Sequence, residues 1–161
     1  MTMFRPQPRF AFSHPAHAVA FGFGAGLSPF APGTAGTALG WALGWAAGAL
    51  PAGIFLLSLV VLFLVGLWAC EVTGRNLGVA DHGGMVWDEV AAFLLVLALV
   101  PRELAWQAAA FVAFRFFDIV KPPPIRAFER RFRGGFGVMF DDVLAAGYTL
   151  LLLALVKRLF F

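Results

Sequence analysis

The feature that most constrains this chain is an uncharged apolar run of eighteen residues, Gly53 to Cys70. A helix needs about 20 such residues to cross a bilayer. Hydrophobic residues make up 61% of the 161-residue chain and charged residues 13%, whereas a soluble domain averages about 45–50% and 25%. The sequence therefore predicts an all-α integral membrane protein, and its length favours a single domain, residues 1–161.

The apolar runs predict about five helices in all, several of them too short to cross a hydrocarbon core of about 30 Å. In the first helix, glycines recur every four residues from Gly36 to Gly48, a spacing that lets a neighbouring helix approach closely. Prolines at positions 51 and 101 predict tight turns between helices. The expected helices cover residues 38–50, 53–70, 87–100, 104–118 and 141–159.

If each helix crosses the membrane, the polar segments 22–37, 71–86 and 118–140 all lie on one face. Residues 1–20 are expected to form a tail or interfacial segment, and residues 118–140 an interfacial loop. Eight basic residues fall on this polar face and three on the other, so the positive-inside rule predicts that it is cytoplasmic. The eight are Arg5, Arg9, Arg75, Lys121, Arg126, Arg130, Arg131 and Arg133; the three are Arg102, Lys157 and Arg158.

Acidic residues gather on the same face, where they would repel one another unless a cation neutralised them. Oxygen ligands with few histidines suit Mg²⁺ better than Zn²⁺, and a single cysteine, Cys70, excludes a disulfide. The alternative is that the doublets Asp88–Glu89 and Asp141–Asp142 cap helix N-termini. The acidic residues are Glu71, Asp81, Asp88, Glu89, Asp118, Asp141 and Asp142.

The segment LSPFAPGTAGT, residues 27–37, carries hydroxyl groups at the point where the first helix is expected to begin. Backbone amides at a helix N-terminus favour phosphate, and flexible glycines allow them to approach it. Ser28, Thr34 and Thr37 are therefore predicted to contact a phosphate. The alternative is that this segment only leads the chain into the membrane.

Three further side chains extend the predicted phosphate site. Arg115 lies in the apolar run FVAFRFFDIV, three residues before Asp118, so the two share a helix face. A charge in a membrane helix is costly and points to a function, although a plain Arg115–Asp118 pair is the alternative. Lys121 follows by one turn and can bind phosphate or anchor the helix at the interface. His82 can donate a hydrogen bond or act as an acid or base.

Four long motifs together resemble the phosphatidylglycerophosphatase A family: GFGAGLSPFAPGTAGT, DHGGMVWDE, FRFFDIVKPPPIR and GGFGVMFDD. They occur in the order and spacing of that family. The resemblance implies a Mg²⁺-dependent phosphatase of the bacterial inner membrane that converts phosphatidylglycerophosphate to phosphatidylglycerol. It implies acidic site positions at Asp81, Asp88, Glu89, Asp118, Asp141 and Asp142, of which Asp88, Glu89, Asp118 and Asp142 are predicted to be catalytic. Glu71 falls outside the motifs.

Two mechanisms fit this resemblance. Mg²⁺ can neutralise the phosphate and activate a water molecule, or a carboxylate can attack to form an acyl phosphate. Metal-activated water is preferred, because carboxylates bound to Mg²⁺ are poorer nucleophiles. The expected partner is a membrane phospholipid, and the modest net charge of +3 does not suggest nucleic acid.

A small cation transporter is the alternative of a different class, with the acidic residues as its ion site. A transporter needs polar groups through the depth of the membrane. Here the half of the chain away from the acidic face is apolar, which favours an enzyme.

Overall fold

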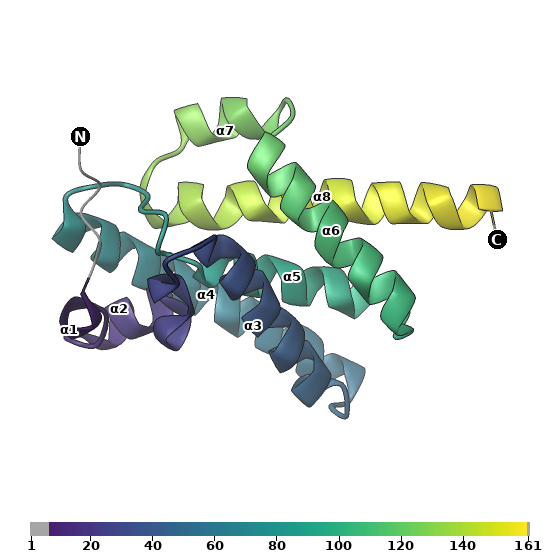
Figure 1. Ribbon diagram of the computed structural model, residues 1–161, viewed down its shortest axis with the longest axis horizontal. Helices are drawn as coiled ribbons and strands as arrows, with labels where there is room; N and C mark the ends of the chain where they lie inside the picture. The colour runs from purple at the N-terminus through teal and green to yellow at the C-terminus, as the bar shows by residue number, and fades with distance from the viewer. Residues whose placement is uncertain (1–6, 161) are drawn as a thin grey trace.

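The computed structural model describes residues 7–160, and this part of the chain is helical, with no β-strand (Figure 1). The prediction of an all-α fold is confirmed. The prediction of about five helices is wrong, because the described residues form nine helical elements. Arg5 and the start of the expected tail lie outside the described residues. The elements are α1 (Pro8–Ala11), α2 (Pro15–Ala20), η1 (Gly22–Leu27), α3 (Pro32–Ala47), α4 (Ala52–Leu77), α5 (Trp87–Leu99), α6 (Leu104–Val120), α7 (Ile125–Arg131) and α8 (Gly134–Phe160).

The five long elements, α3, α4, α5, α6 and α8, correspond to the five expected helices. The four short elements fall in segments expected to be a tail or a loop. Helices α1 and α2 each start at a proline, whose fixed φ suits the first helical position. Prolines in these segments suggest a break in structure, but here Pro8 and Pro15 each begin a short helix.

Helix α5 is the buried centre of the molecule, and α3, α4, α6 and α8 pack around it. Every side chain from Trp87 to Leu94 is buried. Ala91 and Leu94 belong to an apolar cluster shared with α4 and α8, whereas Phe93 belongs to a second cluster shared with α6 and α8. Because α5 begins inside this packing, the polar side chains of its first turn are enclosed as well.

The glycines of α3 let its backbone lie directly on α5. A Cβ atom at Gly36 would lie 2.7 Å from Cβ of Val86, and one at Gly40 would lie 2.9 Å from the carbonyl oxygen of Val90. Real Cβ atoms do not approach this closely, so only glycine permits the contact. The predicted close approach is confirmed at these positions. Gly48 does not take part, because a Cβ there would meet only the backbone of α3 itself.

Three helix boundaries differ most from the prediction. Helix α3 begins at Pro32 instead of residue 38, and α4 continues to Leu77 instead of ending at residue 70. Helix α8 begins at Gly134 instead of residue 141, because Glu71 of α4 accepts a hydrogen bond from the backbone N–H of Gly135, at 2.8 Å. This contact satisfies one of the free amides of the α8 N-terminus. It joins residues far apart in the sequence, so local sequence could not reveal it.

Two helices among the described residues are long and apolar enough to cross a membrane, Ala52–Leu77 and Gly134–Phe160. Only 22% of the most apolar window of each is buried inside the molecule. Helices α3, α5 and α6 have 16, 13 and 17 residues and do not reach that length. Five helices are expected from the sequence to cross the membrane, but only two of those in the described residues are long enough to do so.

Candidate metal and phosphate site

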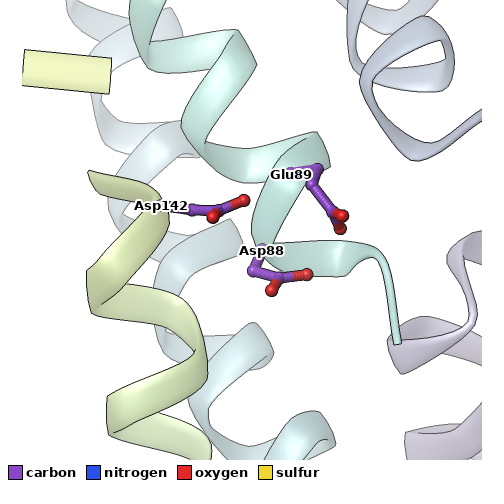
Figure 2. Close-up of side chains that lie close together, drawn as sticks. All are labelled: Asp88, Glu89 and Asp142. Carbon is purple, nitrogen blue, oxygen red and sulfur yellow. The ribbon is translucent and has the colours of Figure 1, made fainter. Parts of the chain in front are cut away.

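Three carboxylates converge where the first turn of α5 meets α8 (Figure 2). Asp88 and Glu89 come from α5, and Asp142 projects toward them from α8. One oxygen from each lies within 4.8 Å of the other two. All three residues are buried, with exposed fractions of 8%, 9% and 2%. We call Asp88, Glu89 and Asp142 the carboxylate triad.

Each member of the triad has an oxygen that no other group satisfies. Asp88 Oδ1, Glu89 Oε2 and Asp142 Oδ2 are buried and accept no hydrogen bond within the described residues. A buried carboxylate without a partner is strongly unfavourable, and three together repel one another. A divalent cation between them would remove both penalties, and an all-oxygen donor set suits Mg²⁺.

Helix capping does not explain both acidic doublets. Asp141 and Asp142 lie two turns inside α8, which begins at Gly134, so the capping alternative is wrong for this pair. Asp88 and Glu89 do lie in the first turn of α5, where the helix dipole favours negative charge. Even there, the N-terminus of α5 has no side-chain capping hydrogen bond.

Arg115 links α6 to the triad. Its Nη1 lies 2.7 Å from Oδ2 of Asp118 and 3.5 Å from Oε1 of Glu89. The Arg115–Asp118 pair considered from the sequence is therefore present, and the same guanidinium also neutralises part of the triad. Asp118 in turn lies close enough to Asp142 to interact with it electrostatically. Arg115 Nε is buried with no partner among the described residues, so the guanidinium has a free donor.

The start of α3 closes over this guanidinium. A Cβ atom at Gly33 would collide with Oε1 of Glu89 and lie 2.8 Å from Nη2 of Arg115. One turn later, the buried Thr37 hydroxyl donates to the carbonyl oxygen of Gly33 at 3.0 Å and accepts from Arg115 Nη1 at 3.4 Å. The segment predicted to bind phosphate therefore reaches the triad through Gly33 and Thr37.

Lys121 forms a second charged centre beside the triad. Its ammonium group donates to Asp141 Oδ2 at 2.5 Å and to Glu129 Oε1 at 3.0 Å. Burial alone would lower the pKa of Lys121, but the hydrogen bonds and negative charges of Asp141 and Glu129 outweigh it and hold that pKa above its ordinary value. Lys121 is therefore a permanent cation. Its backbone is left-handed, with φ 46°, which turns the chain away from α6 and toward α7.

Four predicted residues remain to be placed: Asp81, His82, Ser28 and Thr34. Asp81 is exposed in the loop between α4 and α5, and its charge interacts with those of Lys121 and Asp118. His82 follows it and accepts a hydrogen bond from the Gly84 amide at 3.0 Å. Ser28 donates to the carbonyl oxygen of Phe30 at 2.8 Å, within its own loop. Thr34 is half-buried in the first turn of α3. Phosphate contacts by these residues stay predictions.

A family model named Phosphatidylglycerophosphatase A matches residues 18–157. The chain belongs to the phosphatidylglycerophosphatase A family. A relative of that name from Haemophilus influenzae is 45% identical over 157 residues, which cover 94% of each chain. A second, from Escherichia coli, is 40% identical over 138 residues, covering 85% of this chain and 80% of the relative. The resemblance inferred from the four motifs is thus confirmed.

A third relative, from Bacteroides thetaiotaomicron, carries the provisional name phosphatidylinositol-3-phosphatase. It is 43% identical over 144 residues, covering 84% of this chain and 89% of the relative. No solved structure matches the chain. The names of these phosphatidylglycerophosphatase A relatives and of the third protein all describe removal of a phosphate from a phospholipid head group.

Two residues of the candidate site, Glu129 and Gly33, have roles that the sequence does not predict. Glu129 lies on α7, in a segment expected to be a loop, and pairs with Lys121. From the sequence, Gly33 is expected to offer a flexible backbone amide; that a side chain there would collide with Glu89 is seen only in the structure. The only signal for Glu129 was the charge pattern of the segment IRAFERR, which does not indicate a tertiary partner.

Proposed function

We propose that this phosphatidylglycerophosphatase A family member hydrolyses phosphatidylglycerophosphate to phosphatidylglycerol and inorganic phosphate. The observation that carries the proposal is the buried carboxylate triad with its three unpartnered oxygens. A phosphomonoester is a dianion, and it would need cations both to bind and to react. The triad can hold a divalent cation, and Arg115 lies directly beside it.

Mg²⁺ is the cation that we assign to Asp88, Glu89 and Asp142. These residues offer only oxygen ligands, and Mg²⁺ completes its shell with water and phosphate oxygens. When bound, Mg²⁺ would neutralise phosphate charge and lower the pKa of a water molecule. One oxygen of each residue lies within 4.8 Å of the other two, which brings the three carboxylates together around one site.

The other polar residues position and neutralise the phosphate. Arg115, held by Asp118 and Thr37, would direct its free Nε–H and its charge at the transferring phosphoryl group. The absence of a side chain at Gly33 lets the first turn of α3 pack directly against that guanidinium. Water is the preferred nucleophile. Oxygen-18 from labelled water found in an enzyme carboxylate after one turnover would instead establish an acyl phosphate.

We place the chain in the bacterial inner membrane as a multi-pass protein with its acidic end in the cytoplasm. Large apolar side chains cover the surface of α4, with Leu57 64% and Leu64 56% exposed, and such a surface needs an apolar environment. The acidic end carries the basic residues of α7, whereas Arg102 lies at the opposite turn. The positive-inside rule then orients the site toward the cytoplasm.

Phosphate release by the detergent-solubilised protein tests this function. We expect release from phosphatidylglycerophosphate that requires Mg²⁺ and stops with EDTA. Phosphatidylinositol 3-phosphate should be assayed in parallel, because one relative is named for it. Slow release from both lipids at saturating Mg²⁺ would contradict the proposal. Faster release from the inositol lipid would support a lipid phosphatase but would mean that its preferred substrate is phosphatidylinositol 3-phosphate.

Thiol labelling tests the orientation. With Cys70 replaced by alanine, single cysteines at Gly83 and Arg131 should react with an impermeant reagent from the cytoplasmic side only. A cysteine at Ala52 should react from the other side only. All three positions are exposed, so reactivity reports sidedness. Labelling of positions 83 and 131 from opposite faces would contradict the proposed topology.

A further inference from the structure

The acidic residues of the site divide into two groups, each with its own charge partner. The carboxylate triad has three buried oxygens without a partner among the described residues, and Asp141 Oδ1 is a fourth. Beside the triad, Asp81, Glu129 and Asp141 line one small cavity, and the Lys121 ammonium binds two of these carboxylates directly. Asp81 interacts with the same ammonium electrostatically. We call Asp81, Glu129 and Asp141 the lysine nest.

We propose that the site binds one divalent cation, in the carboxylate triad, and that Lys121 occupies the position where a second ion would otherwise bind, in the lysine nest. This inference rests on the proposed metal-dependent function and deepens it. The ammonium group donates to two of these carboxylates, Asp141 and Glu129, and its charge also acts on Asp81. It supplies a fixed positive charge that neither dissociates nor depends on the ion concentration.

The geometry favours this division over a two-ion centre. Lys121 is held close to Asp141 Oδ2, and Asp141 is 5% exposed, so a second ion could reach that oxygen only by displacing a largely buried ion pair. The left-handed backbone at Lys121 sets the direction of the side chain, and α7 adds Glu129 from the opposite side. In the triad, by contrast, no protein cation contacts Asp88 or Asp142 among the described ion pairs.

Counting bound Mn²⁺ tests the proposal without relying on turnover. Electron paramagnetic resonance of the full chain in a non-ionic detergent separates bound from free Mn²⁺, which serves here as a paramagnetic probe for the Mg²⁺ position. We expect one bound ion per wild-type chain. Two ions would overturn the proposal and leave metal-dependent hydrolysis intact, whereas no bound ion would overturn both. This count needs no variant to fold.

Counting bound Mn²⁺ in the variant Lys121→Met provides a second test. Removing the ammonium leaves Asp141 and Glu129 without the cation that binds them, so we expect the count to rise from one ion to two, with spin–spin broadening between neighbouring ions. Adding Glu129→Gln to this variant should restore a count of one. A count of one in Lys121→Met alone would mean that the nest cannot hold an ion, and would overturn the role assigned to Lys121.

Arg75→Met is the matched control. Arg75 also forms a basic–acidic pair, at 2.7 Å from Glu71, but this pair is exposed and lies outside the nest. Its removal should leave one bound Mn²⁺. A rise to two in this control would show that loss of any positive charge recruits an ion, which would overturn the specific assignment to Lys121.

Discussion

Buried polar groups lie near both ends of α5, but only those at one end have hydrogen-bond partners for all their polar atoms. At the far end from the triad, Gln107 is buried, and its Oε1 accepts hydrogen bonds from the indoles of Trp41 at 2.7 Å and Trp45 at 3.0 Å. Its amide nitrogen donates to the carbonyl oxygen of Arg102 at 3.3 Å. At the acidic end, Asp88 and the rest of the triad keep oxygens with no partner.

This difference in hydrogen bonding indicates that Gln107 has a structural role, whereas the carboxylate triad is suited to binding a ligand. A neutral amide whose oxygen and nitrogen both have partners costs little to bury, and it fixes how α3 and α6 meet. Carboxylates with unpartnered oxygens destabilise the ligand-free fold, so their arrangement is explained only by what they bind. The four predictions below test this contrast, starting with the largest expected effect.

Substitution in the triad should abolish activity and leave the fold intact. We expect Asp88→Asn and Asp142→Asn each to reduce phosphate release by at least about 100-fold, because loss of a metal ligand removes several kcal/mol of charge stabilisation. Unfolding temperature without Mg²⁺ should stay the same or rise, since each change removes a buried like charge. Wild-type turnover at saturating Mg²⁺ in both variants would mean that the triad is not the active site.

Arg115→Leu should reduce turnover by about 10–100-fold with a smaller change in apparent substrate affinity, because the guanidinium acts on charge that develops during transfer. Steady-state kinetics with mixed micelles of substrate and detergent measure both quantities. Arg115→Lys, which keeps the charge but not the fork of donors, should recover part of the loss. Full activity in Arg115→Leu would mean that Arg115 only pairs with Asp118 and does not act on the phosphoryl group.

Gln107→Leu should affect stability and spare catalysis, the reverse of the triad substitutions. The change leaves two indole N–H groups without their acceptor, which costs about 1–3 kcal/mol. Thermal unfolding in detergent should therefore shift down by several degrees. Turnover per folded molecule, measured below that transition, should equal the wild-type value. A selective loss of turnover would show that the far end contributes to the reaction.

Thr37→Val should have the smallest effect, a fall in turnover of less than about fivefold. The hydroxyl holds Arg115 through a long hydrogen bond of 3.4 Å, so its loss loosens the guanidinium without removing it. Ser28→Ala is a matched comparison, because that hydroxyl bonds within its own loop. A larger loss for Ser28→Ala than for Thr37→Val would place the phosphate nearer the loop than the start of α3.

The convergence of the acidic residues could be predicted from the sequence. Helices that alternate in direction and are joined by short far-end turns must bring segments 71–86 and 118–140 to one end. The Arg115–Asp118 pair also follows from helical spacing alone. Both predictions depend on local periodicity and on the order of elements, which a single sequence contains.

The division of labour among the acidic residues could not be predicted. Whether Asp141 pairs with Lys121, while its neighbour Asp142 joins the triad, depends on the rotation of α8 about its axis. That rotation depends on how α8 packs against α4, α5 and α6, which no local sequence pattern determines. Glu129 was missed for a related reason, since α7 acquires its place by packing on α8.

The contact of α3 with α5 also limits which substitutions this family member can accept. At Gly36 and Gly40 a single methyl group would force two backbones apart, and at Gly33 it would collide with the site. At Gly53, in contrast, an added Cβ would meet nothing within 4 Å. A saturation library should therefore return glycine alone at positions 33, 36 and 40 and many residue types at position 53. The positions that do not tolerate substitution would then mark where α3 lies against α5.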